Sequence, residues 1–313
     1  MFFLFTTRYG ISKEGKIIRE GSGRSLGGFR MKPAKEEIIE KIQKLYQELP
    51  GNILPDQEEV DPLCRNLRMF DAPVPGFADA HDPIFEKFKT PGIVGPWYLT
   101  PSEWLPSAGT VISLFFPISE EVRRSNGEAA GGASVQWMYT RYEGQQYIDR
   151  FMEAFSAWLS ASGSDSLVPS SSQRFGTIKA GQGPLLAPGE TMPADTFSSN
   201  WSERHAAYAC GLGTFSLTRA VITEKGAAGR FASVITEAKL PADKRNYSGV
   251  YDYCVRCGAC IERCPVSAID LLHGKDQLKC AGFNRQSLLE HSPRYGCGLC
   301  QTNVPCEGRI PFA

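Results

Sequence analysis

Apolar side chains recur at helical spacing in two stretches of the chain. The first carries them at 38, 39, 42, 45, 46 and 49, before Pro50 and Gly51 end the run, which predicts an amphipathic helix. The second carries them at 148, 151, 152, 155, 158 and 159, ahead of a Ser/Gly-rich loop at 161–172. We expect this second helix to pack an aromatic face on a sheet. A third helix is expected from about Trp201 into the segment CGLGTFSL.

Two short apolar runs predict buried strands. They are residues 111–118 (VISLFFPI) and 231–236 (FASVIT), and both are too short for a buried helix. Residues 50–107 are rich in proline and are expected to be mostly loop, and 173–200 form a second irregular stretch rich in Gly, Pro and Ser. A long irregular connection of this kind is more often functional than idle. A possible short strand at the start completes an α+β pattern.

Composition excludes some classes of protein. The chain has 313 residues, and 34 basic residues balance 34 acidic ones, so no net field attracts nucleic acid or an anionic membrane. The longest apolar stretch is far below the roughly 20 residues that a membrane helix needs. The opening MFFLF lacks the basic region and cleavage site of a secretory signal. We expect a cytoplasmic protein without a membrane or nucleic-acid partner.

Cysteine is the most informative residue type. Eight of the ten cysteines lie in the last 60 residues, whereas a secreted disulfide scaffold is normally a short chain. The run Cys254-x2-Cys257-x2-Cys260-x3-Cys264-Pro has the bacterial ferredoxin spacing, in which the fourth thiolate reaches a different 4Fe-4S cluster. The pattern therefore predicts two clusters.

The remaining thiols complete the two predicted sites. Cluster one would be held by Cys254, Cys257, Cys260 and Cys306, and cluster two by Cys264, Cys280, Cys297 and Cys300. No spacing rule forbids Cys280 and Cys306 from exchanging places. Structural zinc is the competing interpretation, but it favours two separated CxxC pairs over three close cysteines in a row.

The segments at 203–215 (ERHAAYACGLGTF) and 229–240 (GRFASVITEAKL), followed by the two-cluster module, resemble the epoxyqueuosine reductase and corrinoid-dependent reductive dehalogenase superfamily. The resemblance covers roughly residues 95–313. It implies a nitroreductase-like α/β core that cradles cobalamin, with a ferredoxin-like module feeding electrons to the cobalt. We therefore expect an N-terminal extension at 1–95, a cofactor- and substrate-binding core at 96–246, and a double-cluster domain at 247–313.

The resemblance also suggests residues for the cofactor site. Gly211, Leu212, Gly213 and Thr214 would contact cobalamin, because glycine permits a close approach of the backbone to a large flat ligand. The alternative for the two glycines is a helix C-cap followed by a turn. Cys210 and Cys64 are interpreted as small core residues.

Reductive cleavage also needs a proton donor. Tyr208, His205 and Asp195 are the candidates in this neighbourhood. Epoxyqueuosine reductases carry an aspartate in an Asp-Thr-Gly-Pro segment before the Glu-Arg pair, whereas this chain reads FSSN at 197–200. The resemblance therefore does not carry the specific tRNA-modifying activity over to this chain.

Together these features predict an oxidoreductase that passes low-potential electrons through two clusters to a cobalamin, for reduction of a small organic substrate. A ferredoxin- or flavodoxin-type protein would be the electron donor. The alternative is an electron-transfer or activator protein that reduces the corrinoid of a partner protein and turns over no small molecule itself. A flavin in the core is a third possibility.

Overall fold

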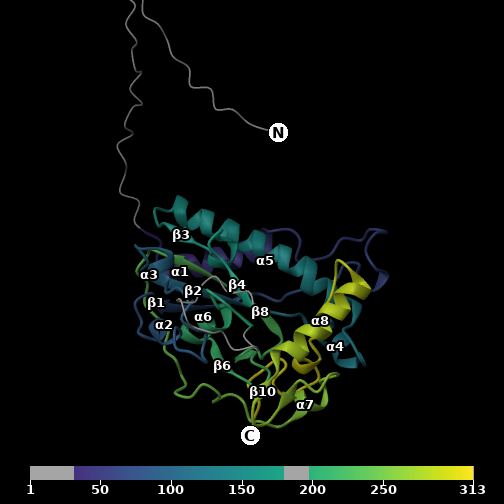
Figure 1. The fold of residues 1–313 in the computed structure, drawn as a ribbon. Coiled ribbons are helices and arrows are strands. Elements are labelled where there is room, and N and C mark those ends of the chain that lie inside the picture. Colours follow the sequence, from purple (N-terminus) through teal and green to yellow (C-terminus); the bar gives the residue numbers. More distant parts are fainter. Residues whose placement is uncertain (1–31, 180–196, 313) are drawn as a thin grey trace, which may run out of the picture. The chain divides into compact units, whose positions relative to one another are not determined.

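The computed structural model describes residues 32–179 and 197–312. At its centre lies an antiparallel sheet with the strand order β1-β2-β8-β3 (Figure 1). The four strands are β1 (Val74–Asp79), β2 (Thr110–Pro117), β8 (Gly229–Thr236) and β3 (Ser166–Leu167). The two strands predicted at 111–118 and 231–236 are confirmed as β2 and β8. The strand expected at the start lies outside the described residues.

Strand β2 is buried along its whole length, because both faces of the sheet are covered. Its side chains alternate between two hydrophobic clusters. Ile112 and Leu114 belong to the cluster under α1 (Lys35–Glu48) and α5 (Val135–Ala161), whereas Val111 belongs to the cluster on the other face. This alternation explains why the strand reads as a continuous apolar run.

The helices α1 and α5 cover one face of the sheet, and both were predicted. Helix α1 buries Ile38, Ile42 and Leu45. Helix α5 begins at Val135, well before the first apolar position used to predict it. Gly144 interrupts the apolar pattern of α5. A side chain at this position does not fit, because its Cβ would come within 2.8 Å of the Phe70 ring. Close packing against that ring explains a glycine inside a helix.

The opposite face is covered by α6 (Glu203–Ala209), with the short helices α2 (Ile84–Lys87) and α3 (Pro101–Trp104). Trp201 lies at the centre of this layer. Its ring stacks with Tyr98 at 5.7 Å and with Phe85 at 6.5 Å between centroids, and Trp104 meets it edge-on. The predicted helix near Trp201 is confirmed as α6.

The prediction that residues 50–107 are mostly loop missed β1. This strand contains Pro75 and Gly76, which disfavour a strand by propensity, but it lies at the edge of the sheet, where proline is tolerated. Since β1 pairs with β2, part of the chain before residue 95 belongs to the central sheet. The division into 1–95, 96–246 and 247–313 stays a prediction.

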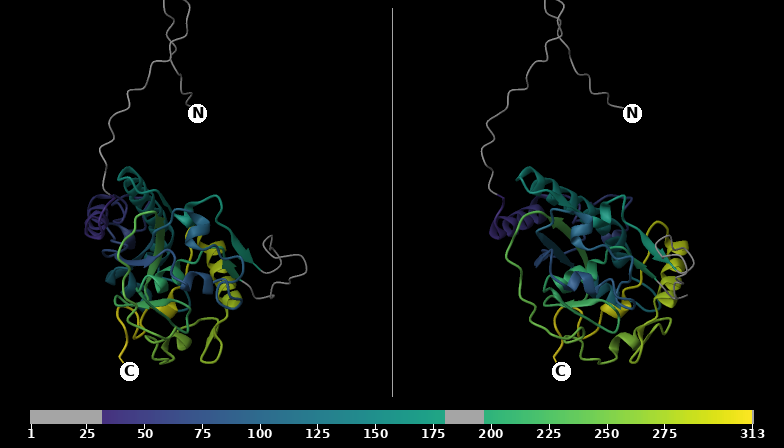
Figure 2. Two further views of the ribbon diagram at one scale, coloured as in Figure 1. Left: turned by 90° about the vertical axis from the view of Figure 1, so that its left-hand side faces the viewer. Right: turned by 60° about the vertical axis from the view of Figure 1, so that its left-hand side comes forward.

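The cysteine-rich residues extend from the sheet through short elements. In both views of Figure 2, α8 (yellow) lies across the core from α1 (purple).

The remaining helices are α4 (Glu120–Glu128), α7 (Ala259–Glu262), α8 (Gln277–His291) and the 3-10 turns η1 (Pro62–Cys64), η2 (Pro169–Ser171) and η3 (Leu299–Gln301). The remaining strands form three hairpins: β4 (Thr177–Lys179) with β5 (Phe197–Ser199), β6 (Gly213–Phe215) with β7 (Val221–Thr223), and β9 (Ile269–Asp270) with β10 (Gly274–Lys275).

The predicted mixed fold with a sheet flanked by helices is confirmed. Within the described residues, no helix has both the length and the apolar character to cross a membrane.

Replacing Phe151 by alanine tests the core between α5 and the sheet. The Phe151 side chain is completely buried and meets the Phe116 ring edge-on at 5.3 Å. We expect Phe151→Ala to lower the free energy of unfolding by about 3–5 kcal/mol, since it leaves a cavity. Anaerobic denaturant unfolding measures the effect. Ile53→Ala, at a side chain that is 53% exposed, is the control, and equal losses in the two variants would contradict this description of the core.

Candidate functional site

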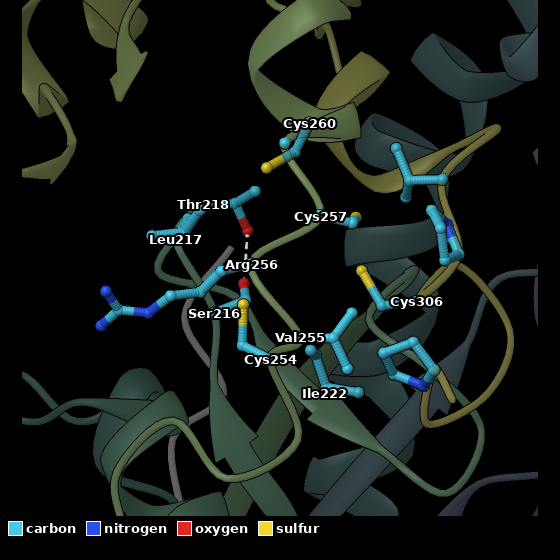
Figure 3. A pocket seen from close by; sticks show the side chains of 14 residues that line it. Ser216, Leu217, Thr218, Ile222, Cys254, Val255, Arg256, Cys257, Cys260 and Cys306 are labelled. Atoms are coloured by element: carbon cyan, nitrogen blue, oxygen red, sulfur yellow. Dashed lines mark hydrogen bonds between the residues drawn. The ribbon is translucent and has the colours of Figure 1, made fainter. Parts of the chain in front are cut away.

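The eight C-terminal cysteines separate into two groups of four, each around its own cavity. The first cavity has about 350 Å³ of space, counting the part open to solvent, and the second about 710 Å³. The cysteines that line the first are Cys254, Cys257, Cys260 and Cys306. Those that line the second are Cys264, Cys280, Cys297 and Cys300. Figure 3 shows the sulfur atoms of the first group around one space.

The cysteine spacing left open whether Cys280 and Cys306 exchange places between the two groups, and the positions in space bear on that question. Cys264 leaves the other three cysteines of its run and lines the second cavity, and Cys280 and Cys306 lie in different cavities. The division in space is therefore the same as the first of the two divisions considered from the sequence. The role of the eight thiols as cluster ligands stays a prediction.

Burial makes these thiols poor thiolates on their own. It raises the pKa of Cys260 and of Cys297 to about 11 and that of Cys306 to about 12, and negative charge on neighbouring cysteines raises these pKa values further. Buried thiolates therefore require a cation among them. Iron in a 4Fe-4S cluster is such a cation, so the donor set fits the cluster.

No described group of three or more His, Cys, Asp or Glu residues is placed to hold a single metal ion. A cube does not require such convergence, because its four ligands bind separate corners.

Two N–H groups point at sulfur in the second group. The Ala268 amide donates to Cys264 Sγ at 3.2 Å, and the Asn284 side chain donates to Cys280 Sγ at 3.6 Å. Such hydrogen bonds stabilise negative charge on sulfur and tune a cluster's potential.

The two cavities are neighbours. Thr218, in the connection between β6 and β7, lines both. Its side chain is buried and lies 2.8 Å from the Ser216 hydroxyl. The β6–β7 hairpin is therefore the wall that the two cavities share.

The second cavity also borders the core. Trp137 and Arg141 of α5 and Arg204 of α6 line it. The Arg141 guanidinium lies over the Tyr295 ring at 4.4 Å, and its Nε atom is buried without a hydrogen-bond partner. Arg204 lies deep in the protein yet keeps accessible surface, because it faces this cavity. Sequence reasoning missed these residues, since only the fold brings α5 and α6 beside the cysteines.

Of the three predicted proton donors, two lie side by side on α6. The rings of His205 and Tyr208 both contact Phe215, at 4.8 and 5.9 Å between centroids. Burial and the adjacent Arg204 lower the pKa of His205 to about 4, so its ring is neutral at pH 7. Burial raises the pKa of Tyr208. Neither residue lines a cysteine cavity, and Asp195 lies outside the described residues.

The residues expected to contact cobalamin serve the local fold. Gly211 has a φ of +79° and ends α6, and the next amide bonds back to the Ala207 carbonyl at 3.0 Å, which is a helix C-cap. A Cβ on Gly213 would overlap the Ile222 carbonyl. Thr214 is fully buried and accepts a hydrogen bond from the Tyr253 amide at 2.9 Å.

Leu212 is also buried, and none of the residues 211–214 lines either cavity. Local structure thus accounts for both glycines, and a cobalamin contact at 211–214 stays a prediction. In contrast, the interpretation of Cys64 and Cys210 as core residues is confirmed, because both are completely buried.

Sequence reasoning also missed a buried carboxyl group at the start of α6. Ser233 donates to Glu203 Oε2 at 2.6 Å and accepts from the Trp201 indole at 2.9 Å. Glu203 Oε1 is buried without a partner. Burial raises the pKa of Glu203 to about 8, against the effect of these hydrogen bonds. The group is therefore mainly protonated at pH 7.

Comparison with known proteins supports the cluster module and the fold. Residues 249–270 match the family model described as a 4Fe-4S binding domain. This match covers the run Cys254 to Cys264 and makes the C-terminal part similar to iron–sulfur proteins. No curated protein matches the chain.

Solved structures of similar fold are oxidoreductases. A tagged variant of a catabolic reductive dehalogenase has a TM-score of 0.50 and 14% identity, over 88% of this chain and 37% of that one. An epoxyqueuosine reductase from Bacillus subtilis has a TM-score of 0.46 and 18% identity, over 89% and 66%. An epoxyqueuosine reductase with a tRNA stem loop has a TM-score of 0.46 and 16% identity, over 89% of this chain and 66% of that one.

At these identities the likeness concerns the fold alone, and that part of the predicted resemblance is confirmed. The chain spans about two thirds of the length of these epoxyqueuosine reductases and 37% of the dehalogenase.

Two matched glycines test how the second cluster site is built. Gly258 and Gly298 both follow the first cysteine of a CxxC pair and have φ values of +82° and +68°. A Cβ on Gly298 would overlap the Trp137 indole, whereas a Cβ on Gly258 meets nothing within 4 Å. We expect Gly298→Ala to lose about half of the bound iron and Gly258→Ala to keep it, despite a similar backbone strain of about 1–2 kcal/mol. Iron and sulfide analysis of anaerobic protein measures this, and equal losses would contradict it.

Replacing Glu203 by glutamine tests its protonation. The raised pKa means that folding binds a proton between pH 4.5 and about 8, so this carboxyl lowers stability as the pH rises through that window. Glutamine resembles the protonated form. We expect the stability of Glu203→Gln relative to wild type to increase by about 3–5 kcal/mol from pH 5 to pH 9. Denaturant unfolding at both pH values measures this against the exposed control Glu58→Gln. A difference that does not change with pH would show that Glu203 is ionised in the fold.

Proposed function

We propose that the chain is an iron–sulfur oxidoreductase that passes single electrons through two neighbouring 4Fe-4S clusters to an acceptor at the core. One observation carries the proposal: eight cysteines divide four and four around adjacent cavities, and the second cavity borders α5 and α6. Two clusters of this type transfer single electrons. The match of residues 249–270 to a 4Fe-4S domain supports the same conclusion.

Each part of the chain has a separate task in this proposal. The four cysteines of the first cavity hold cluster one, and those of the second hold cluster two. Cys257 is exposed, so a low-potential electron donor of the ferredoxin or flavodoxin type reaches cluster one first. The amide of Ala268 and the side chain of Asn284 support charge on the sulfur atoms of cluster two.

A corrinoid is the candidate acceptor, and a small organic molecule the candidate substrate. Both follow from the resemblance of the segments at 203–215 and 229–240. Residues 211–214 are the candidate contacts to the corrinoid in this proposal, although local structure also accounts for the two glycines. Tyr208 is the proton donor in this proposal, since its phenol is protonated and the neutral His205 ring lacks the extra proton. The flavin has no support in the described residues and is not part of the proposal.

A second candidate is an activator that reduces the corrinoid of a partner protein. The sequence FSSN at 197–200, in place of the Asp-Thr-Gly-Pro segment of epoxyqueuosine reductases, favours it. Anaerobic titration with cobalamin separates the two candidates. Tight binding to the chain supports the enzyme, whereas absence of binding together with electron transfer to a corrinoid protein supports the activator. Nucleic acid remains an unexpected partner, and a binding measurement with a tRNA stem loop tests that expectation.

Iron analysis of cysteine variants tests the clusters. Anaerobic wild-type protein should contain about eight iron and eight sulfide per chain. We expect Cys306→Ser and Cys300→Ser each to lose about half of the iron, because each removes a ligand from a different group. Cys210→Ala is the matched control, since Cys210 is buried outside both groups. Stoichiometric zinc in place of iron, or an equal loss in the control, would overturn the proposed function.

A further inference from the structure

The two cysteine cavities differ in the charges that line them. Arg141, Arg204 and Lys275 line the second cavity, and no aspartate or glutamate does. Arg256 is the single charged residue that lines the first cavity. Figure 3 shows its side chain directed away from the sulfur atoms, and its guanidinium lies 5.8 Å from the centre of the Tyr251 ring. Positive charge therefore faces the second group of thiols and not the first.

The three cations of the second cavity have no carboxylate partner among the described residues. Arg141 stacks on Tyr295, and its Nε atom is left without an acceptor. Arg204 and Lys275 form no ion pair in the described part of the chain, and each attracts the Cys300 thiolate. Three cations without acidic partners beside four thiols favour negative charge in the second cavity.

A reduced cluster meets this requirement better than an oxidised one. Reduction adds one negative charge to a cluster that four thiolates already make anionic. A cation close to it stabilises the reduced form more than the oxidised form. Charge and solvent exposure are known determinants of the potentials of such clusters. The cluster with the cationic lining therefore has the higher reduction potential.

We propose that Arg141, Arg204 and Lys275 make cluster two the higher-potential cluster and so direct electrons from the exposed cluster one towards the core. The step moves one electron, oxidises cluster one and reduces cluster two, and makes or breaks no bond. Arg204 is a positioning residue in this step, acting on cluster two through its charge. The inference rests on the proposed function only in that both clusters are present.

An anaerobic redox titration followed by electron paramagnetic resonance tests the inference on the full chain. In wild-type protein, cluster two should be reduced before cluster one. The Cys306→Ser variant, which keeps cluster two, identifies its signal. We expect Arg204→Gln to lower the equilibrium constant for electron transfer from cluster one to cluster two at least about tenfold, which is about 59 mV for one electron.

Controls separate charge from structure. Arg204→Lys keeps the charge and should keep most of the wild-type difference in potential. Arg285→Gln removes a charge from an exposed position on α8 that does not line the cavity, and should leave both potentials unchanged. If Arg204→Gln loses cluster two, Lys275→Gln takes its place, with a lowered potential of cluster two as the expected result.

The possible outcomes separate failure of this inference from failure of the proposed function. Normal iron content with potentials of Arg204→Gln equal to those of Arg285→Gln overturns the inference and leaves the proposed function in place. Reduction of cluster one before cluster two in wild-type protein also overturns it. Wild-type protein without iron overturns both.

Discussion

Burial disfavours the thiolate form of several cysteines near the C-terminus, and this constraint governs what the cysteine module can bind. Burial raises the pKa of Cys260, Cys297 and Cys306 far above the neutral range. Iron would remove the penalty by binding the thiolates, and metal binding and folding of this region would then be coupled.

The sheet and its helices supply the fixed framework that brings charged side chains to the cysteine module. Strand β2 is buried on both sides, so α5 and α6 are held at fixed positions on opposite faces. Their ends bring Arg141 and Arg204 to the second cavity. The core thus places positive charge beside one group of thiols, while Cys257 of the other group is exposed. In the proposed function, a site for electron entry and a charged acceptor site follow from this single arrangement of elements.

The two glycines of the segment at 211–214 have a local explanation. Gly211 ends α6 with a positive φ, and Gly213 allows β6 to approach the Ile222 carbonyl. Backbone geometry therefore accounts for both glycines without a ligand. The Oε1 atom of Glu203, which has no hydrogen-bond partner, and the accessible Arg204 side chain are nearby groups with unused capacity for binding.

The sequence by itself determined the elements whose pattern is local. Apolar spacing identified α1, the C-terminal part of α5, β2 and β8. The cysteine spacing indicated an iron–sulfur site, because three thiols two residues apart suit one cluster. Strand β1 was missed, since its proline is permitted only by a place at the sheet edge that pairing decides. Only the tertiary structure separated Cys280 from Cys306 and brought Arg141 and Arg204 to the second cavity. These contacts join residues far apart in the chain, and no local pattern records which faces of α5, α6 and the cysteine module pack together.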